Sequence, residues 1–120
     1  MADYLPKFQP ATAVTFTASV AVNGGQAVEL TGARTVGPAG AASTKYVGVA
    51  GHSAAAGQKV TVHMPGCVQR ILSAGVIAAG DRVQCGASGT VAAGTTAAIG
   101  TALTAATAAG QLVEVLDRPI

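Results

Sequence analysis

The amino-acid sequence contains one order of short segments twice, and this duplication limits what the chain can fold into. Residues 25–62 hold the segments GQAVEL, RTV, YVGVA and AAGQKVTV, and residues 80–115 hold GDRVQC, GTV, AIGTA and AAGQLVEV in the same order. The spacing between corresponding segments changes only through the lengths of the loops between them. A unit of this size is too small to bury a core alone, so we expect the two copies to pack together as one domain of residues 12–120.

Composition predicts a thin hydrophobic core. Hydrophobic residues make up 50% of the 120 residues, but many are alanine, and the chain holds two Phe, two Tyr and no Trp. Burial of Val or Leu contributes about 1.5–3 kcal/mol, and burial of Ala contributes far less. We therefore expect a modestly stable monomer that gains stability by association.

Alternation of apolar and polar residues predicts an all-β fold. In residues 12–22, Val14, Phe16, Ala18, Val20 and Val22 fall on one face of a half-buried strand. Short strands about ten residues apart are typical of a compact small β-barrel or β-sandwich. The further strands that we predict are 26–31, 45–50, 58–63, 67–72, 82–85, 97–103 and 111–116.

Glycines mark the turns between these strands. Gly57, Gly80 and Gly110 each follow two alanines and precede a predicted strand. A glycine there takes a positive φ without a Cβ clash, so we predict that the three are structural turn glycines. The alanine-rich run 104–109 is the alternative site of a helical turn, and at most one or two such turns are expected.

The first eleven residues differ from the rest and form a predicted extended N-terminal arm. Proline resists helix formation and withholds an N–H donor, and aromatic side chains on an extended segment suit docking into a partner's groove. One interpretation is a disordered tail, and the other is an arm that docks on a partner. The docking residues would be Tyr4, Leu5, Pro6, Lys7, Phe8, Gln9 and Pro10.

The charge pattern and the start of the chain argue against several kinds of partner and location. Charged residues are 10% of the chain and the net charge is +2, without a run of Lys or Arg, which disfavours nucleic acid binding. The start of the chain lacks the basic and apolar regions of a signal peptide, so we expect synthesis in the host cytoplasm. The uncharged stretch 86–113 is interrupted by glycines, which disfavours a membrane span.

Candidates for chemistry are few. His52 and Ser53 resemble a nucleophile elbow superficially, but the corresponding place in the second copy lacks both residue types, so a loop after a strand is the preferred interpretation. His52, His63, Cys67 and Cys85 lack the close paired spacing of a structural zinc site. Cys85 occupies the place of Leu30 in the first copy and is expected to be a small buried apolar residue.

The order and spacing of these segments carry a resemblance that spans nearly the whole chain. An extended start is followed by GQAVEL, VGVA, AAGQKVTV, IAAGDRV over 77–83 and IGTA over 99–102. This pattern resembles the small capsid decoration, or head cement, proteins of tailed bacteriophages. The resemblance implies a non-enzymatic, β-rich virion protein without a metal, cofactor or small-molecule substrate, which sits as a homotrimer on the major capsid protein.

The resemblance also implies where the protein acts. It would lie on the outer surface of the expanded head, at three-fold and quasi-three-fold positions, and stabilise the shell, with residues 4–10 as the capsid-binding arm. One alternative is a biotinyl or lipoyl carrier domain, which has a similar rhythm around residues 76–87 but presents a lysine between its repeats. Lys7, Lys45 and Lys59 lie elsewhere. Another alternative is a different β-rich virion structural protein.

Overall fold

The computed structural model describes residues 13–66 and 68–117, and these form an all-β fold, as predicted. The predicted arm residues Tyr4 to Pro10 and Cys67 lie outside the described residues. Within the described part of the chain, no helix has the length and hydrophobicity to cross a membrane. The elements are β1 (Ala13–Ala18), β2 (Ala27–Gly32), β3 (Thr35–Pro38), β4 (Tyr46–Ala50), β5 (Lys59–His63), β6 (Val68–Leu72), β7 (Arg82–Cys85), the 3₁₀ turn η1 (Ala87–Gly89), β8 (Val91–Ala93), β9 (Ala98–Ala102) and β10 (Leu112–Asp117).

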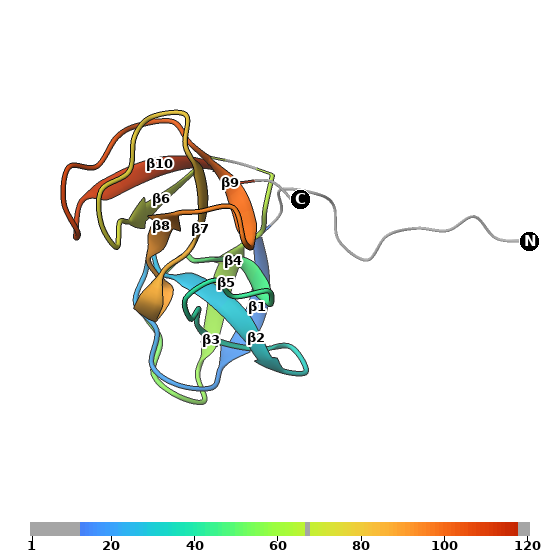
Figure 1. The fold of residues 1–120 in the computed structure, drawn as a ribbon. Coiled ribbons are helices and arrows are strands. Elements are labelled where there is room, and N and C mark those ends of the chain that lie inside the picture. Colours follow the sequence, from blue (N-terminus) through green and yellow to red (C-terminus); the bar gives the residue numbers. More distant parts are fainter. Residues whose placement is uncertain (1–12, 67, 118–120) are drawn as a thin grey trace, which may run out of the picture.

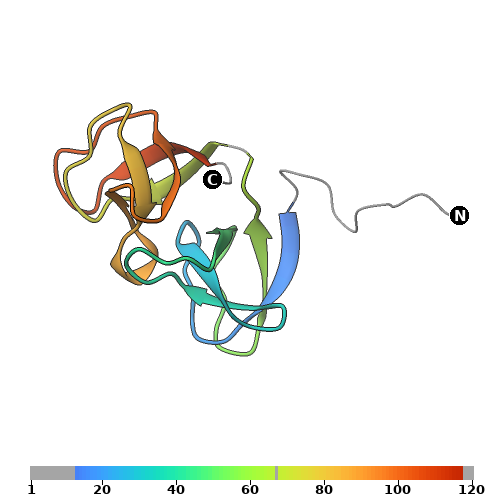
Figure 2. The same ribbon diagram turned by 45° about the vertical axis from the view of Figure 1, so that its right-hand side comes forward.

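Each copy of the repeat is one five-stranded unit. The first forms a closed barrel in the order β1-β3-β2-β4-β5, and the second forms a sheet in the equivalent order, β6-β10-β9-β7-β8. β1 and β3 pair in parallel, with Ala18 opposite Val36, and the same pairing recurs 55 residues later as a bridge between Ser73 and Val91. The two units lie one beside the other, blue to green and yellow to red (Figures 1 and 2).

The duplication therefore begins earlier than the repeated segments indicate. β1 and β6 take equivalent places in the two units, although they share little beyond alternating apolar residues. The prediction also missed β3 and β8, which are only four and three residues long. Strands this short give too few alternating positions for a periodicity to be recognised.

Turn backbones repeat along with the strands. Gly57 and Gly110 have φ of +83° and +84°, and their N–H groups donate to the carbonyls of Ala18 (2.7 Å) and Ser73 (2.9 Å). Gly80 has φ of +92° and donates to the Ala102 carbonyl (2.8 Å). A Cβ at these glycines would meet no atom within 4 Å, so the turn conformation and not a lack of space requires glycine.

The predicted end of the first strand is wrong, and the alternative of a helical turn in residues 104–109 does not occur. Val20 is 52% exposed, because β1 ends at Ala18 and the chain bends before Val22 becomes buried again. Residues 104–109 do not form a helical turn. Ala106 instead exchanges two backbone hydrogen bonds with Ile77, at 2.8 and 2.9 Å, which extends the second unit by a bridge.

The hydrophobic core is built largely from valine and alanine. One buried cluster belongs entirely to the first unit and contains Phe16 among small side chains. The other cluster lies mostly in the second unit but also takes in Ala27, Ala39 and Val49 from the first. The expected sharing of a core between the copies thus occurs only where the units meet, and each unit encloses most of its own core.

Cys85 shows how this contact between the units protects a side chain. Cys85 is fully buried, whereas Leu30, its equivalent in the first unit, is 38% exposed. The loop after β3 lies against Cys85, since the N–H of Ala42 donates to the Cys85 carbonyl at 2.8 Å. Burial raises the pKa of the Cys85 thiol to about 12, with smaller contributions from the charges of Glu29 and Asp117.

We predict that Cys85 is unreactive until the protein unfolds. With a pKa of about 12, roughly one thiol in ten thousand is ionised at pH 8, and the thiolate is the reactive form. In a Cys67→Ser variant, reaction with a disulfide reagent should be at least a hundredfold slower for native protein than for protein in guanidinium chloride. Rapid labelling of the native variant would show that the loop does not cover Cys85.

Candidate functional site

The structure places His52 and Ser53 on an exposed loop after β4, as the preferred interpretation predicted. The Nε2 atom of His52 accepts the Thr61 N–H at 3.1 Å, and its Nδ1 atom lies 3.0 Å from the Ser53 carbonyl oxygen. The Ser53 hydroxyl oxygen accepts the Gly24 N–H at 3.3 Å. Both side chains therefore bond to loop backbone, and this is not the contact between hydroxyl and imidazole that activates a serine.

The other candidate ligands are spread over the molecule. His63 ends β5 on the first unit and is exposed, whereas Cys85 is in the core of the second. Cys67 lies outside the described residues. Among residues 13–66 and 68–117, no three His, Cys, Asp or Glu side chains are grouped so that they could hold a metal ion.

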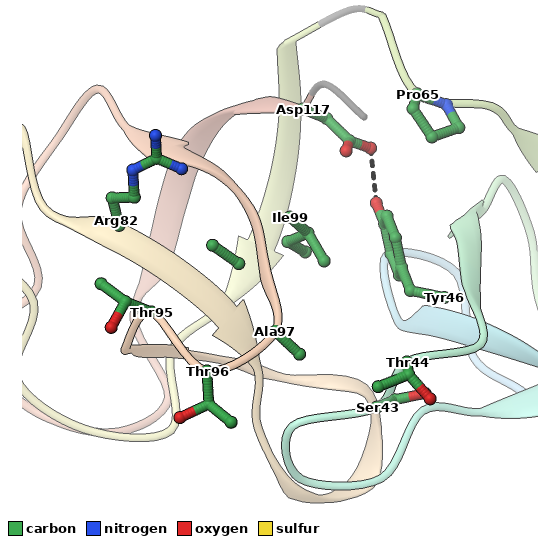
Figure 3. A pocket seen from close by; sticks show the side chains of 11 residues that line it. Ser43, Thr44, Tyr46, Pro65, Arg82, Thr95, Thr96, Ala97, Ile99 and Asp117 are labelled. Carbon is green, nitrogen blue, oxygen red and sulfur yellow. Dashed lines mark hydrogen bonds between the residues drawn. The ribbon is translucent and has the colours of Figure 1, made fainter. Parts of the chain in front are cut away.

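A groove with a volume of about 640 Å³ lies between the two units (Figure 3). Ser43, Thr44 and Tyr46 line it from the first unit, and residues 95–99 line it from the second. These two segments are equivalent, because each joins the third strand of its unit to the fourth. The groove thus lies where corresponding loops of the two copies approach each other.

Equivalent side chains hold these loops in place. The Glu29 carboxylate accepts the Gly40 N–H at 2.9 Å, and its counterpart Gln84 accepts the N–H groups of Thr96 (3.2 Å) and Ala97 (3.4 Å). The bond from Gly40 lowers the pKa of Glu29, with help from Ser43 and Lys45 and against a small effect of burial. The repeated position therefore serves in both copies to order a groove loop.

Asp117 is the one buried acid in the described part of the chain, and it is among the residues that line the groove. The Tyr46 hydroxyl donates to its Oδ2 atom and so joins the two units, and Figure 3 shows the two side chains pointing toward each other. The buried Oδ1 atom of Asp117 has no hydrogen-bond partner among the described residues. Burial raises the pKa of Asp117 to about 6, and the Tyr46 and Gln69 side chains oppose this rise.

Sequence reasoning missed Asp117 and Tyr46, although one signal was present. Val113, Val115 and Asp117 alternate along β10, so the pattern places the acid on the buried face. The corresponding residue of the first unit is Met64, which packs against the apolar core. This exchange of an apolar residue for an acid marks the contact between the units.

The Asp117 environment predicts a stability that falls as pH rises. Its pKa in the folded state, about 6, exceeds the ordinary value of 3.8, so the folded protein binds a proton more tightly than the unfolded chain. The free energy of unfolding should therefore decrease between about pH 4 and pH 6, by up to about 3 kcal/mol from this group. Glu29 has the opposite effect on the free energy of unfolding, which it raises as pH rises, because its pKa is lowered in the folded state.

An Asp117→Asn variant separates the two effects. Chemical unfolding at pH 4.5 and pH 7.5 should show that the variant lacks the decrease in the free energy of unfolding that Asp117 causes. At pH 7.5 the variant should therefore be more stable than wild type. Parallel pH dependence of the two proteins would contradict a buried, proton-binding Asp117.

Comparison with known proteins agrees with this architecture. Residues 8–116 match a family model described as phage cement protein. No curated protein sequence matches the chain. Among solved structures, the head fiber gp8.5 N base of bacteriophage phi29 is similar, with a TM-score of 0.67 and 22% sequence identity over 91% of this chain and 98% of that chain.

The structural likeness concerns the fold, and the family match concerns the sequence over most of its length. Phage cement proteins are a family of structural, capsid-associated virion proteins and not a family of enzymes. This agrees with the described part of the groove, where the Glu29 and Gln84 side chains bond to loop backbone. The chain belongs to the phage cement protein family.

Proposed function

We propose that the protein binds the outer surface of the expanded phage head as homotrimers at three-fold and quasi-three-fold positions. There it would hold neighbouring copies of the major capsid protein together and stabilise the shell. The observation that carries this proposal is the family match over residues 8–116. Production in the host cytoplasm and addition to the finished shell complete the proposal.

The fold suits a protein that resists force on a shell. Closing a sheet into a barrel removes free edges, so the first unit has every strand paired on both sides. The second unit approaches the same closure through the Ser73–Val91 bridge. Two such units give a small body in which much of the backbone is fixed by hydrogen bonds although the core side chains are small.

The proposed attachment to the shell is the arm of residues 4–10. The family match begins at residue 8 and so includes Phe8, Gln9 and Pro10 of this segment. Tyr4, Leu5 and Phe8 provide the large side chains that an extended peptide lays into a partner's groove. The body would then set the position on the lattice while the arm supplies affinity.

The carrier-domain alternative has less support. Lys45 lies on the loop before β4, and the Nζ atom of Lys59 donates to the Thr17 hydroxyl at 2.9 Å at the start of β5. Neither lysine lies on the segment that joins the two units, residues 64–67. The family match favours the cement function over this alternative.

The direct test adds purified protein to expanded heads that lack it and locates it by electron cryomicroscopy. The proposal predicts three copies around each three-fold and quasi-three-fold axis on the outer surface. Unexpanded heads are the matched control and should take up less protein. Density at five-fold positions only, or single isolated copies, would contradict the proposed trimer.

Removal of Met1 to Pro10 should separate attachment from folding. β1 begins at Ala13, so the truncated protein should keep its β spectrum and melting temperature. If Tyr4, Leu5 and Phe8 each lose about 1 kcal/mol of burial in the shell, affinity should fall roughly a hundredfold per subunit, and more for a trimer. Retention on heads after dilution, measured by sedimentation, checks this.

The control for this truncation is a full-length chain in which Tyr4, Leu5 and Phe8 are replaced by serine. It should behave like the truncated protein, because the proposed affinity comes from these side chains and not from chain length. Equal retention of the wild-type and truncated proteins would show that the body alone makes the capsid contact.

A further inference from the structure

The outer side of the second unit carries large apolar side chains that its own fold leaves in solvent. Leu72 lies opposite Leu112 across the β6–β10 ladder, and both are exposed, at 45% and 60%. Val68 at the other end of β6 is 51% exposed, and Leu103 bonds through its N–H to the Glu114 carbonyl and is 45% exposed. We define the β6–β10 face as Val68, Arg70, Leu72, Leu103, Leu112 and Glu114.

The first unit is an internal control for this face. Its equivalent ladder joins β1 to β5, where Thr17 lies opposite Lys59 and Thr15 lies opposite Thr61. Leu103 corresponds to Gly51, since the Gly51 N–H donates to the Thr61 carbonyl as that of Leu103 does to Glu114, both at 2.7 Å. The same strand arrangement thus forms with small or polar side chains outside.

It follows that folding does not require the apolar side chains of the β6–β10 face. In both units the core is filled by the alternate side chains of these strands, such as Val60 and Val62 in the first unit and Val113 and Val115 in the second. Neighbouring exposed apolar residues that the fold does not use are typical of a surface that a partner covers.

The charges on the face indicate which partner. Arg70 and Glu114 lie directly opposite each other in the ladder, between the leucines and Val68. Within the described part of the chain neither side chain makes an ion pair. The face therefore presents one positive and one negative group side by side, so Arg70 of one copy can pair with Glu114 of the next, whereas a partner with one sign of charge would match only half of the face.

The shape of the face also suits an inserted side chain. A hollow of about 370 Å³ lies beside the ladder and is lined by Arg70, Leu112, Glu114 and neighbouring residues of the loop after β9. A leucine or valine of another copy would fit into such a hollow and remove apolar surface of both copies from water. The exposed apolar side chains, the two opposite charges and the hollow thus occur together on one face of the second unit.

We propose that the β6–β10 face is the surface through which copies of this chain contact one another, with Arg70 of each copy paired to Glu114 of the next around a three-fold axis. This inference rests on the proposed trimer and names the surface that forms it. Leu72 and Leu112 would be covered in the assembly, and the polar outer ladder of the first unit would remain in solvent.

The first experiment replaces two leucines of the β6–β10 face by the residue types found at the equivalent positions of the first unit. Leu72→Thr with Leu112→Lys installs the residue types of Thr17 and Lys59, so the variant should fold with an unchanged β spectrum. Sedimentation of free protein and of protein released from heads should show trimers for wild type, with self-association at least about a hundredfold weaker for the variant.

The matched control replaces exposed apolar residues outside the face by the same two residue types, threonine and lysine. Val20→Thr with Leu30→Lys alters two exposed apolar residues of the first unit and should leave self-association within about threefold of wild type. Equal weakening by both pairs of substitutions, or no weakening by the first pair, would overturn the assignment of the face.

The second experiment exchanges the charges. Arg70→Glu alone and Glu114→Arg alone each place like charges together in every contact and should weaken association about tenfold or more. The double variant restores opposite charges and should recover association to within about threefold of wild type. A double variant that stays as weak as the single variants would overturn the pairing of Arg70 with Glu114.

The third experiment identifies the occupant directly, in solution and on saturated heads. A Leu112→Cys chain in a Cys67→Ser background is labelled with a photoreactive maleimide, while buried Cys85 stays unlabelled. Irradiation should give an adduct of twice the 11.6 kDa chain mass. Adducts with the major capsid protein only, or no adduct in either setting, would overturn the proposal. Self-adducts in solution without head binding would instead count against the proposed function alone.

Discussion

The structure depends on closing a ribbon of five short strands by one parallel pairing between the first and third strands. Thr17 and Ala18 pair with Thr35 and Val36 in the first unit, and Ser73 meets Val91 at the same point of the second. A barrel of so few strands has little interior space, and apart from Phe16 the buried side chains of the first unit are valine and alanine. The valine and alanine of this chain are therefore a consequence of closure, and backbone hydrogen bonds carry much of the cohesion that large core residues supply elsewhere.

Duplication makes each unit a control for the other, and the differences between them indicate function. Turn glycines, loop-holding Glu29 and Gln84, and the interior valines are shared, which identifies them as requirements of the fold. The Asp117 carboxylate in place of Met64 belongs to the contact between the units. The outer face of β6 and β10 also differs from its counterpart, because it exposes leucine and valine, and it is the face that we propose for association.

Sequence periodicity predicted the fold class and most strands because each barrel strand alternates between core and outside. It missed the short strands β3 and β8, and it extended β1 to Val22, since a bend leaves no apolar signature. The groove was not foreseen, although an acid at an inward position of β10 could have drawn attention to Asp117. The outer face required the strand register, because the sequence alone does not state which residues lie opposite one another.

The central claim is that this protein strengthens a phage head, and the mechanical stability of the shell tests it most directly. Expanded heads without the protein, and the same heads after its addition, would be heated while DNA release is followed with a dye that the shell excludes. The account predicts a higher release temperature for decorated heads, in proportion to the fraction of sites occupied. Equal release temperatures at full occupancy would show that the protein decorates the head without cementing it.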